Sequence, residues 1–353
     1  MRKYLILAPH QFLENAKTAH GVIRYAEDET VAVIEPDFAG KRVRDVMPHL
    51  LSDAPFVSSV AQGLRYSPTA LLIGTAPKAG ALPAAWRGEI LAAIAAKLEI
   101  VSGLHDLLND DAEFVDAART HGVRLWDVRV PPEVPLFSGA AYDVQPPIVL
   151  AVGSDCAVGK MTVMLELSRA ARERGRRPAF VPTGQTGIMI AGWGIAVDRV
   201  ISDFAPGAAE QLVLEAEKRG DLILVEGQGG INHPAYAPVT LSLLFGCAPD
   251  ALILVVDPTR DRIESYSVPR LSYRALIRTY EALCATVKPA RVLGIALNTR
   301  ALSESAAHAA IDAARRETGL PVDDVVRFGP SALYDAVAPG ILKGRVLGER
   351  VTA

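Results

Sequence analysis

The sequence has few cysteines and lacks the spacings that bind metals or form disulfide frameworks. Its 353 residues include three cysteines, Cys156, Cys247 and Cys284, and no CxxC pair. Cysteines so far apart indicate neither a structural zinc site nor a set of disulfides. We therefore expect no bound metal of that kind and a reducing compartment, the cytoplasm.

Long apolar runs and an excess of positive charge are also missing. The N-terminal stretch MRKYLILAPHQF holds an apolar run of about five residues, which is too short for a signal peptide, and no run of about 18 apolar residues occurs. The net charge is -3 and the pI is about 6.2, so no basic surface for nucleic acid or anionic lipid is indicated. We expect a cytoplasmic protein with a small-molecule partner, without nucleic acid or membrane partners, and forming a homo-oligomer.

Short apolar segments alternate with helical patterns along the whole chain. In the first part, strands are predicted at 3–8, 30–36, 70–76, 98–103 and 124–131, with helices at 88–98 and 111–122. A proline-rich stretch at 131–147 is the predicted linker. Beyond it, strands are predicted at 147–153, 177–183, 221–227, 250–258 and 291–298, and helices near 162–175, 207–219, 269–287 and 304–317.

This alternation predicts the fold class. Apolar strands separated by amphipathic helices are typical of parallel sheets covered on both faces. We predict an α/β protein of two doubly wound domains, with a Rossmann-like N-terminal domain at 1–135 and a P-loop NTPase-like C-terminal domain at 136–353. The turn after the first strand lacks the GxGxxG pattern, so we expect no nicotinamide cofactor.

A glycine-rich turn between a predicted strand and a predicted helix marks a phosphate-binding loop. Backbone amides and the positive end of a helix dipole bind phosphate oxygens in such a turn, and a lysine reaches along the phosphates. The candidate ligand-binding residues are Gly153, Ser154, Asp155, Cys156, Ala157, Val158, Gly159, Lys160, Met161 and Thr162. Five residues, one more than usual, separate the two glycines. Either Ser154 takes the place of the first glycine, or the loop is the longer one that it resembles in dethiobiotin synthetase-like enzymes.

Met161 stands where nucleotide hydrolases have a hydroxyl that binds magnesium. A thioether is a poor ligand for a hard cation. Thr162 follows, but one step along a helix turns a side chain by about 100°. The loop therefore predicts a diphosphate that is held without being cleaved, and it leaves open whether magnesium accompanies the ligand.

Polar residues follow other predicted strands, where the ligand crevice of an α/β sheet lies. Glu226, Gly227, Gln228 and Gly229 form a motif that resembles the V-E-G-A-G-G of dethiobiotin synthetase-like enzymes. Asn298 ends a later strand and is predicted either to bind a purine edge or to sit in a turn. Asp198 and Asp203 lie in a glycine-rich segment and could hold a metal, receive an ammonium group or act as a base.

The motif strings taken together resemble a known family. GSDCAVGKMT, PTGQTGIMIAGWGIAVDRVISDFAPGAAE and VEGQGGINHPAY, preceded by AKTAHGVIRY and IVSGLHDLL, are similar to the family known as domain of unknown function 1611 over nearly the whole chain. The resemblance implies a Rossmann-like domain followed by a P-loop domain. It also implies, from some members, a D-glutamate N-acetyltransferase that uses acetyl-CoA in D-amino acid catabolism. Other members are known only as nucleotide-binding proteins.

Acetyl-CoA as co-substrate would explain a loop that grips a diphosphate without splitting it. Under this resemblance Lys160 and the loop amides bind the diphosphate, and Asn298 is a candidate for the adenine. The candidate general bases are Asp198, Asp203, Glu226 and His233, and the candidate substrate-binding residues are Lys17, Arg24, Arg129 and Thr186. The alternatives are an ATP- and magnesium-dependent ligase or kinase of the dethiobiotin synthetase type, and a nucleotide-binding module without catalysis.

Overall fold

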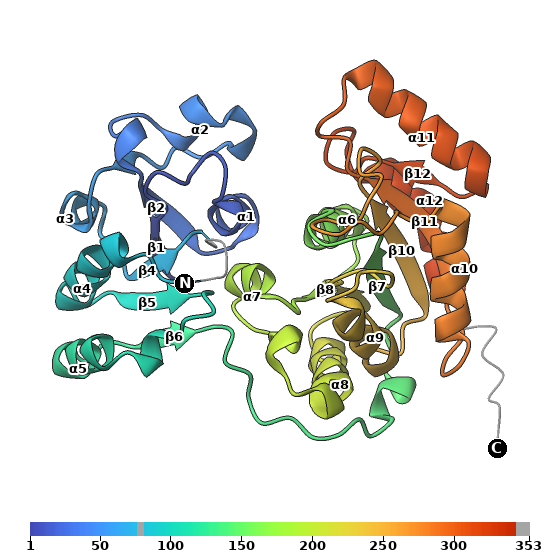
Figure 1. Cartoon of the computed structure of the whole chain (residues 1–353), viewed down its shortest axis with the longest axis horizontal. Helices are drawn as coiled ribbons and strands as arrows, with labels where there is room; N and C mark the ends of the chain where they lie inside the picture. The colour runs from blue at the N-terminus through green and yellow to red at the C-terminus, as the bar shows by residue number, and fades with distance from the viewer. Residues whose placement is uncertain (76–80, 344–353) are drawn as a thin grey trace. The chain divides into compact units, whose positions relative to one another are not determined.

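Each part of the chain builds a parallel six-stranded sheet with helices packed on it, as the computed structural model shows (Figure 1). The structure describes residues 1–75 and 81–343. The chain forms two compact units: the first contains residues 1–131 and 185–196, and the second contains 132–184 and the residues from 197 onward. The predicted α/β class with two doubly wound domains is confirmed.

The sheet of the first unit has the strand order β3-β2-β1-β4-β5-β6. Its strands are β1 (Lys3–Leu7), β2 (Glu29–Ile34), β3 (Phe56–Val57), β4 (Ala70–Ile73), β5 (Glu99–Ser102) and β6 (Leu125–Asp127). Its helices are α1 (Lys17–Tyr25), α2 (Val43–Val46), α3 (Val60–Gly63), α4 (Arg87–Ala95), α5 (Ala112–His121) and α7 (Gln185–Ala191). The strand order reverses between β1 and β4, which is where such sheets bind ligands.

Helix α7 covers the carboxyl ends of the strands of the first sheet. In the sequence, however, it follows β8 (Pro178–Val181), a strand of the second unit. The hydroxyl oxygens of Thr186 and Thr18 lie 3.0 Å apart, and Arg129 donates a hydrogen bond of 2.8 Å to Gln185. A Cβ at Gly103, just past β5, would lie 3.0 Å from Gln185 Cγ, so strand end and helix are in close contact (Figure 1). The carboxyl ends of the first sheet are thus covered by a helix that comes later in the chain than the whole of that sheet.

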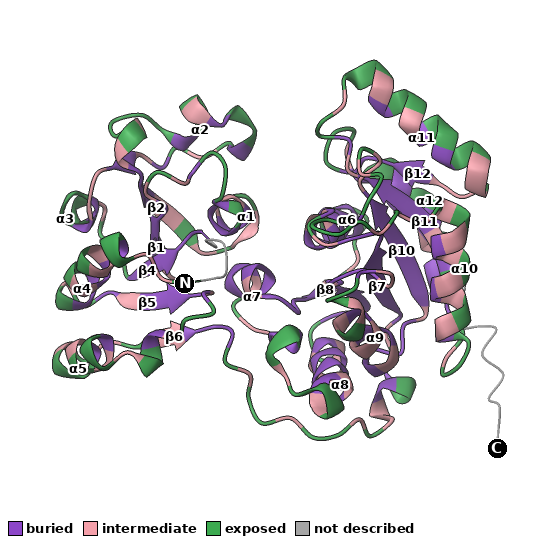
Figure 2. Ribbon diagram, in the orientation of Figure 1, coloured by how far each residue is buried: buried purple, intermediate pink, exposed green. Residues whose placement is uncertain are grey.

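The sheet of the second unit has the strand order β12-β11-β10-β7-β9-β8. Its strands are β7 (Ile148–Gly153), β8 (Pro178–Val181), β9 (Leu222–Val225), β10 (Ala251–Val256), β11 (Arg291–Leu297) and β12 (Val322–Asp323). Its helices are α6 (Lys160–Glu173), α8 (Ala205–Glu217), α9 (Ala237–Gly246), α10 (Tyr273–Cys284), α11 (Glu304–Thr318) and α12 (Ser331–Lys343). Every residue of β7 and β10 is buried, as expected for strands covered on both faces (Figure 2).

The proline-rich stretch after residue 131 is packed on the second unit. The amides of Ser138 and Ala141 donate to the carboxylate of Glu210 at 2.7 and 3.1 Å. A Cβ at Gly207 would lie 2.0 Å from the carbonyl oxygen of Pro135, so α8 and this stretch touch through their backbones. Among the described residues, no helix has the length and apolar character needed to cross a bilayer.

Candidate functional site

The phosphate loop lies between the buried strand β7 and helix α6, as the glycine spacing predicts. Ala157 and Gly159 have positive φ values of 52° and 110°, which turn successive backbone amides toward one side. The side chain of Lys160 folds back into the loop, where Nζ donates to the carbonyl oxygens of Asp155 and Gly229, both at 2.7 Å. Since Lys160 is only 6% exposed, its ammonium is part of the loop interior.

The glycines after β9 lie directly on this loop. A Cβ at Gly227 would lie 1.7 Å from the carbonyl oxygen of Ala151, and one at Gly230 would lie 3.0 Å from the backbone nitrogen of Asp155. A Cβ at Gly153 would meet Lys160 Nζ at 2.9 Å. The two motifs predicted from the sequence are therefore brought into contact, and their glycines are what allows the approach.

The carboxylate of Glu226 joins the ends of β9 and β8. One of its oxygens, Oε2, accepts hydrogen bonds from the amides of Thr183 and Gly184 at 3.0 and 3.2 Å. The hydroxyl of Thr183 donates to the Glu226 carbonyl at 2.9 Å, and Gln228 donates to the Thr183 carbonyl. Glu226 is 8% exposed, so it is a carboxylate held in a fixed position next to the glycine loop.

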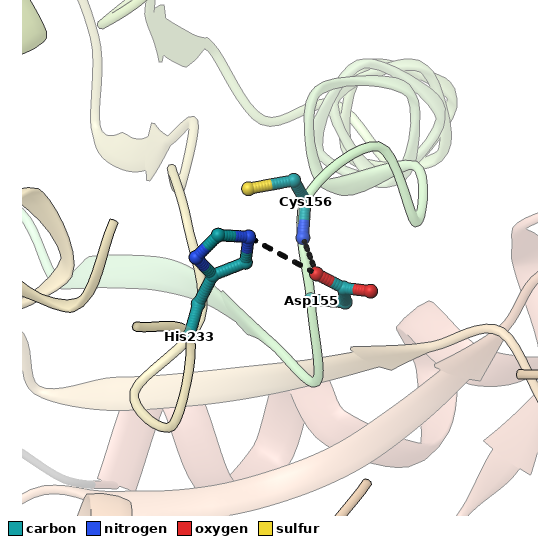
Figure 3. A group of neighbouring side chains, drawn as sticks. All are labelled: Asp155, Cys156 and His233. Atoms are coloured by element: carbon teal, nitrogen blue, oxygen red, sulfur yellow. Dashed lines mark hydrogen bonds and ion pairs between the residues drawn. The ribbon is translucent and has the colours of Figure 1, made fainter. Parts of the chain in front are cut away.

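Asp155 organises a buried polar cluster inside the loop (Figure 3). Its Oδ1 accepts from the amide of Cys156 at 2.7 Å, and its Oδ2 accepts from the amide of Glu264 at 2.8 Å and from Arg260 at 3.2 Å. The ring of His233 faces the same carboxylate, with Nε2 at 3.8 Å from Oδ1.

The hydrogen bonds of His233 decide which ring nitrogen carries the proton. Nδ1 lies 3.1 Å from the amide nitrogen of Ala235 and 3.2 Å from that of Tyr236, so it accepts both hydrogen bonds. The proton of the neutral ring is therefore on Nε2, which points at Asp155. In this arrangement His233 is a donor toward the loop, and it lacks the free basic nitrogen that a general base needs.

A metal fits this cluster poorly. One ligand atom each from Asp155, Cys156 and His233 lies within 4.8 Å of the others. However, the His233 nitrogen that faces the cluster bears the proton, and moving that proton to Nδ1 would set it against the amides of Ala235 and Tyr236. Met161, 7% exposed at the start of α6, supplies no hydroxyl for magnesium.

Two residues that support the loop, Arg260 and Tyr280, were not predicted from the sequence. Arg260, after β10, donates to Asp155 and also to the Cys156 carbonyl at 3.0 Å. The hydroxyl of Tyr280, on α10, donates to the Gly153 carbonyl at 2.6 Å and accepts from the amide of Ile231 at 3.0 Å. Complete burial raises the pKa of this phenol far above its ordinary value. Only the position of Arg260 just past an apolar strand could have suggested a role.

Asn298 and Ser154 also lie at the loop. Asn298 Nδ2 donates to the Val158 carbonyl at 3.3 Å, and its Oδ1 accepts from the amide of Arg300 at 3.3 Å, so Asn298 supports the loop from the β11 side. The buried hydroxyl of Ser154 has no hydrogen-bond partner within the described part of the chain. Both side chains stay candidates for ligand contacts.

The remaining predicted residues lie elsewhere in the fold. Asp198 and Asp203 are exposed, on the short 3-10 turns Val197–Arg199 and Ser202–Phe204 of the second unit. Lys17, Arg24, Arg129 and Thr186 belong to the first unit. Of these, Lys17 and Arg24 are exposed on α1, whereas Arg129 and Thr186 are buried and make the contacts with Gln185 and Thr18.

Comparison with known proteins agrees with both halves of the fold. A model described as the P-loop domain of a domain of unknown function, DUF1611_C, matches residues 135–334, and the Rossmann-like DUF1611_N model matches 36–131. The chain is 39% identical to a solved DUF1611 family protein from Anabaena variabilis ATCC 29413, with a TM-score of 0.90 over 96% of this chain and 100% of that one.

Two curated relatives carry the name D-glutamate N-acetyltransferase. The protein from Tritonibacter scottomollicae is 34% identical over 327 residues, which is 92% of this chain and 94% of the relative. The protein from Pseudoalteromonas sp is 34% identical over 279 residues, or 78% of this chain and 83% of the relative. With both domain models matched and relatives spanning most of its length, the chain belongs to the DUF1611 family.

Proposed function

We propose that this protein is an N-acetyltransferase that transfers the acetyl group of acetyl-CoA to the amine of an acidic amino acid, D-glutamate. The observation that carries the proposal is a complete phosphate loop in which a buried methionine follows the lysine. The two relatives named D-glutamate N-acetyltransferase support the choice of reaction and substrate.

Coenzyme A suits such a loop because its diphosphate serves for binding and takes no part in acyl transfer. The loop amides and the N-terminus of α6 would bind the phosphate oxygens. Lys160 already places its ammonium in the loop, so a bound phosphate would replace one of its carbonyl partners. Asn298 remains the candidate for the adenine, beside the loop.

The reaction needs a nucleophilic amine and a place for the charge that develops on the carbonyl oxygen. The base takes a proton from the substrate ammonium, and the free amine attacks the thioester carbonyl. The tetrahedral oxyanion then collapses, the carbon–sulfur bond breaks, and the departing thiolate takes up the second proton that the nitrogen loses to become the CoA thiol. The amides of residues 227–230 are the candidate oxyanion donors. Of the four candidate bases, Glu226 is favoured, because Asp198 and Asp203 are exposed and His233 presents a proton toward the loop.

The test is to measure N-acetylated product by mass spectrometry after incubation with acetyl-CoA and D-glutamate, L-glutamate or D-aspartate. We expect D-glutamate to be acetylated without ATP. Glu226→Gln keeps an oxygen that accepts from Thr183 and Gly184, yet it cannot take a proton, so kcat should fall by about 10²- to 10⁴-fold with KM for acetyl-CoA little changed.

Asp203→Asn is the matched control, since it removes an exposed candidate carboxylate and should leave kcat unchanged. If none of the three amino acids is acetylated and ADP is released from ATP in the presence of magnesium, the proposal is contradicted and a ligase or kinase is favoured. Full activity of the Glu226→Gln variant would remove Glu226 as the base while leaving the reaction in place.

A further inference from the structure

Three aromatic rings, His233, Tyr236 and Tyr266, form a wall beside the phosphate loop. The ring centroid of His233 lies 4.5 Å from that of Tyr236 and 5.2 Å from that of Tyr266. His233 is 2% exposed, whereas Tyr236 is 52% and Tyr266 is 40% exposed. The wall therefore has a buried inner ring facing the loop and two tyrosines open to a ligand.

Tyr266 is held out by a short hairpin that is fixed to the loop. Ile263 and Val268 are joined by a backbone hydrogen bond of 2.9 Å, and the amide of Glu264 donates to Asp155. Ser265, just before the tyrosine, has a φ of 65°, a conformation that costs a residue other than glycine about 1 kcal/mol. The hairpin is thus anchored to the loop at Glu264 and carries the exposed ring of Tyr266 in its turn.

Tyr236 is fixed in a different way. Its amide donates to His233 Nδ1, and it directly precedes helix α9. The same imidazole thus positions the backbone of one tyrosine, contacts the rings of both, and points its other nitrogen at Asp155. The aromatic wall and the phosphate loop are consequently one connected structure.

The order of the strands indicates which end of a bound nucleotide would lie near the aromatic wall. β7, which leads into the loop, has β10 and then β11 on one side and β9 on the other. Asn298 follows β11, while His233 and Tyr236 follow β9 and Tyr266 belongs to the β10–α10 connection. His233 and Tyr236 thus lie across β7 from Asn298, and Tyr266 reaches the His233 ring from the β10 side. With the adenine at Asn298, the other end of the diphosphate would lie toward His233 and Tyr236.

We propose that the aromatic wall binds the pantetheine arm of acetyl-CoA, an inference that rests on the proposed function. The arm alternates apolar carbons with amide groups, and tyrosine offers an apolar face with a polar hydroxyl. The sulfur of Cys156 lies next to His233, which extends the wall with a polarisable atom (Figure 3). Two open tyrosines hold the arm along the loop, and Tyr236 lies next to Gly229, whose amide is a candidate oxyanion donor.

Titration calorimetry with two matched ligands tests this assignment, because dephospho-CoA is ADP with the pantetheine arm added. Tyr236→Ala and Tyr266→Ala should each weaken binding of acetyl-CoA and dephospho-CoA by about fivefold to twentyfold and leave ADP affinity within about twofold. Tyr236→Phe should keep most of the affinity, since the ring remains.

Tyr142→Ala is the control, because Tyr142 is an exposed tyrosine of the second unit that packs on Phe137. Equal losses of affinity for ADP and dephospho-CoA would overturn the inference, because the wall would then bind the adenine ring. Unchanged affinities for both ligands would also overturn it, because the wall would then contact neither. A wild-type protein that binds no acetyl-CoA would contradict the proposed function itself, so the two failures are told apart before any variant is made.

Discussion

Replacing Lys160 by methionine isolates the contribution of its ammonium to ligand binding. Methionine keeps an unbranched stem of similar length, which still packs between Gly153 and Gly227. An ammonium has three donors, and two of them serve the carbonyl oxygens of Asp155 and Gly229 at 2.7 Å. A bound phosphate would take one of these donors in place of a carbonyl oxygen, and the methionine variant loses that charge-assisted contact.

One hydrogen bond to a charged group contributes about 1.5 to 3 kcal/mol. The dissociation constant of acetyl-CoA should therefore rise by about tenfold to 150-fold in the Lys160→Met variant, measured by titration calorimetry at fixed ionic strength. Lys218→Met is the matched control, because Lys218 carries the same charge on the second unit, is 73% exposed and pairs with Glu215. Its variant should bind within about twofold of the wild type, since exposed charges contribute little.

Equal affinity in the Lys160→Met and wild-type proteins would refute the reasoning, since the diphosphate would then lie outside the loop. Equal losses in both lysine variants would refute it as well, because a general effect of net charge would account for the result. The melting temperature of each unliganded variant, followed by circular dichroism, shows whether an altered loop has unfolded.

Three further substitutions test separate parts of the site. Met161→Ser restores a hydroxyl at the start of α6 and should raise ATP affinity only when magnesium is present; calorimetry with and without the ion decides, and equal gains would argue against our explanation of the methionine. Tyr280→Phe leaves a buried carbonyl and a buried amide without a partner and should lower the free energy of unfolding by about 2 to 4 kcal/mol, measured by urea titration. Gly227→Ala places a methyl group against the Ala151 carbonyl, so it should lower the free energy of unfolding by about 1 to 3 kcal/mol or more and weaken ligand binding. Gly88→Ala is the control, because no atom lies within 4 Å of the added methyl group, and it should change neither quantity.

The fold was predictable wherever strands are fully buried. Runs such as IVLAVG and ALILVV are apolar throughout because both faces of the sheet are covered, and these runs became β7 and β10. The two-residue strands β3 and β12 are too short to produce a pattern. The predicted strand at 70–76 ends at Ile73, and its last position lies outside the described residues.

Helix α7 was missed for a physical reason. Its sequence, QTGIMIA, contains a glycine and lies in a glycine-rich segment that suggests a flexible loop. Burial of Ile188, Met189 and Ile190 in the first unit stabilises the helix there. Contacts so distant in sequence leave no local pattern, and for the same reason the sequence assigned residues 185–196 to the second domain.

The site was predictable in part. The stretches 153–162 and 226–230 carry recognisable glycine spacings, and the structure brings them together. Arg260 and Tyr280 were not predictable, because single residues on other elements become relevant only when the chain folds. The role of His233 depended on which neighbours hydrogen-bond to Nδ1, which no sequence motif specifies.

Because α7 belongs to the first unit, the order of synthesis affects how that unit folds, and truncation of the chain affects its stability. A ribosome delivers residues 1–131 first, but the segment that completes their packing is synthesised only after β7, α6 and β8. The nascent first unit must wait with the carboxyl edge of its sheet uncovered, and a fragment ending near residue 131 would stay in that state. We therefore expect such a fragment to expose apolar surface and aggregate, whereas adding residues 185–196 as a separate peptide should restore its solubility.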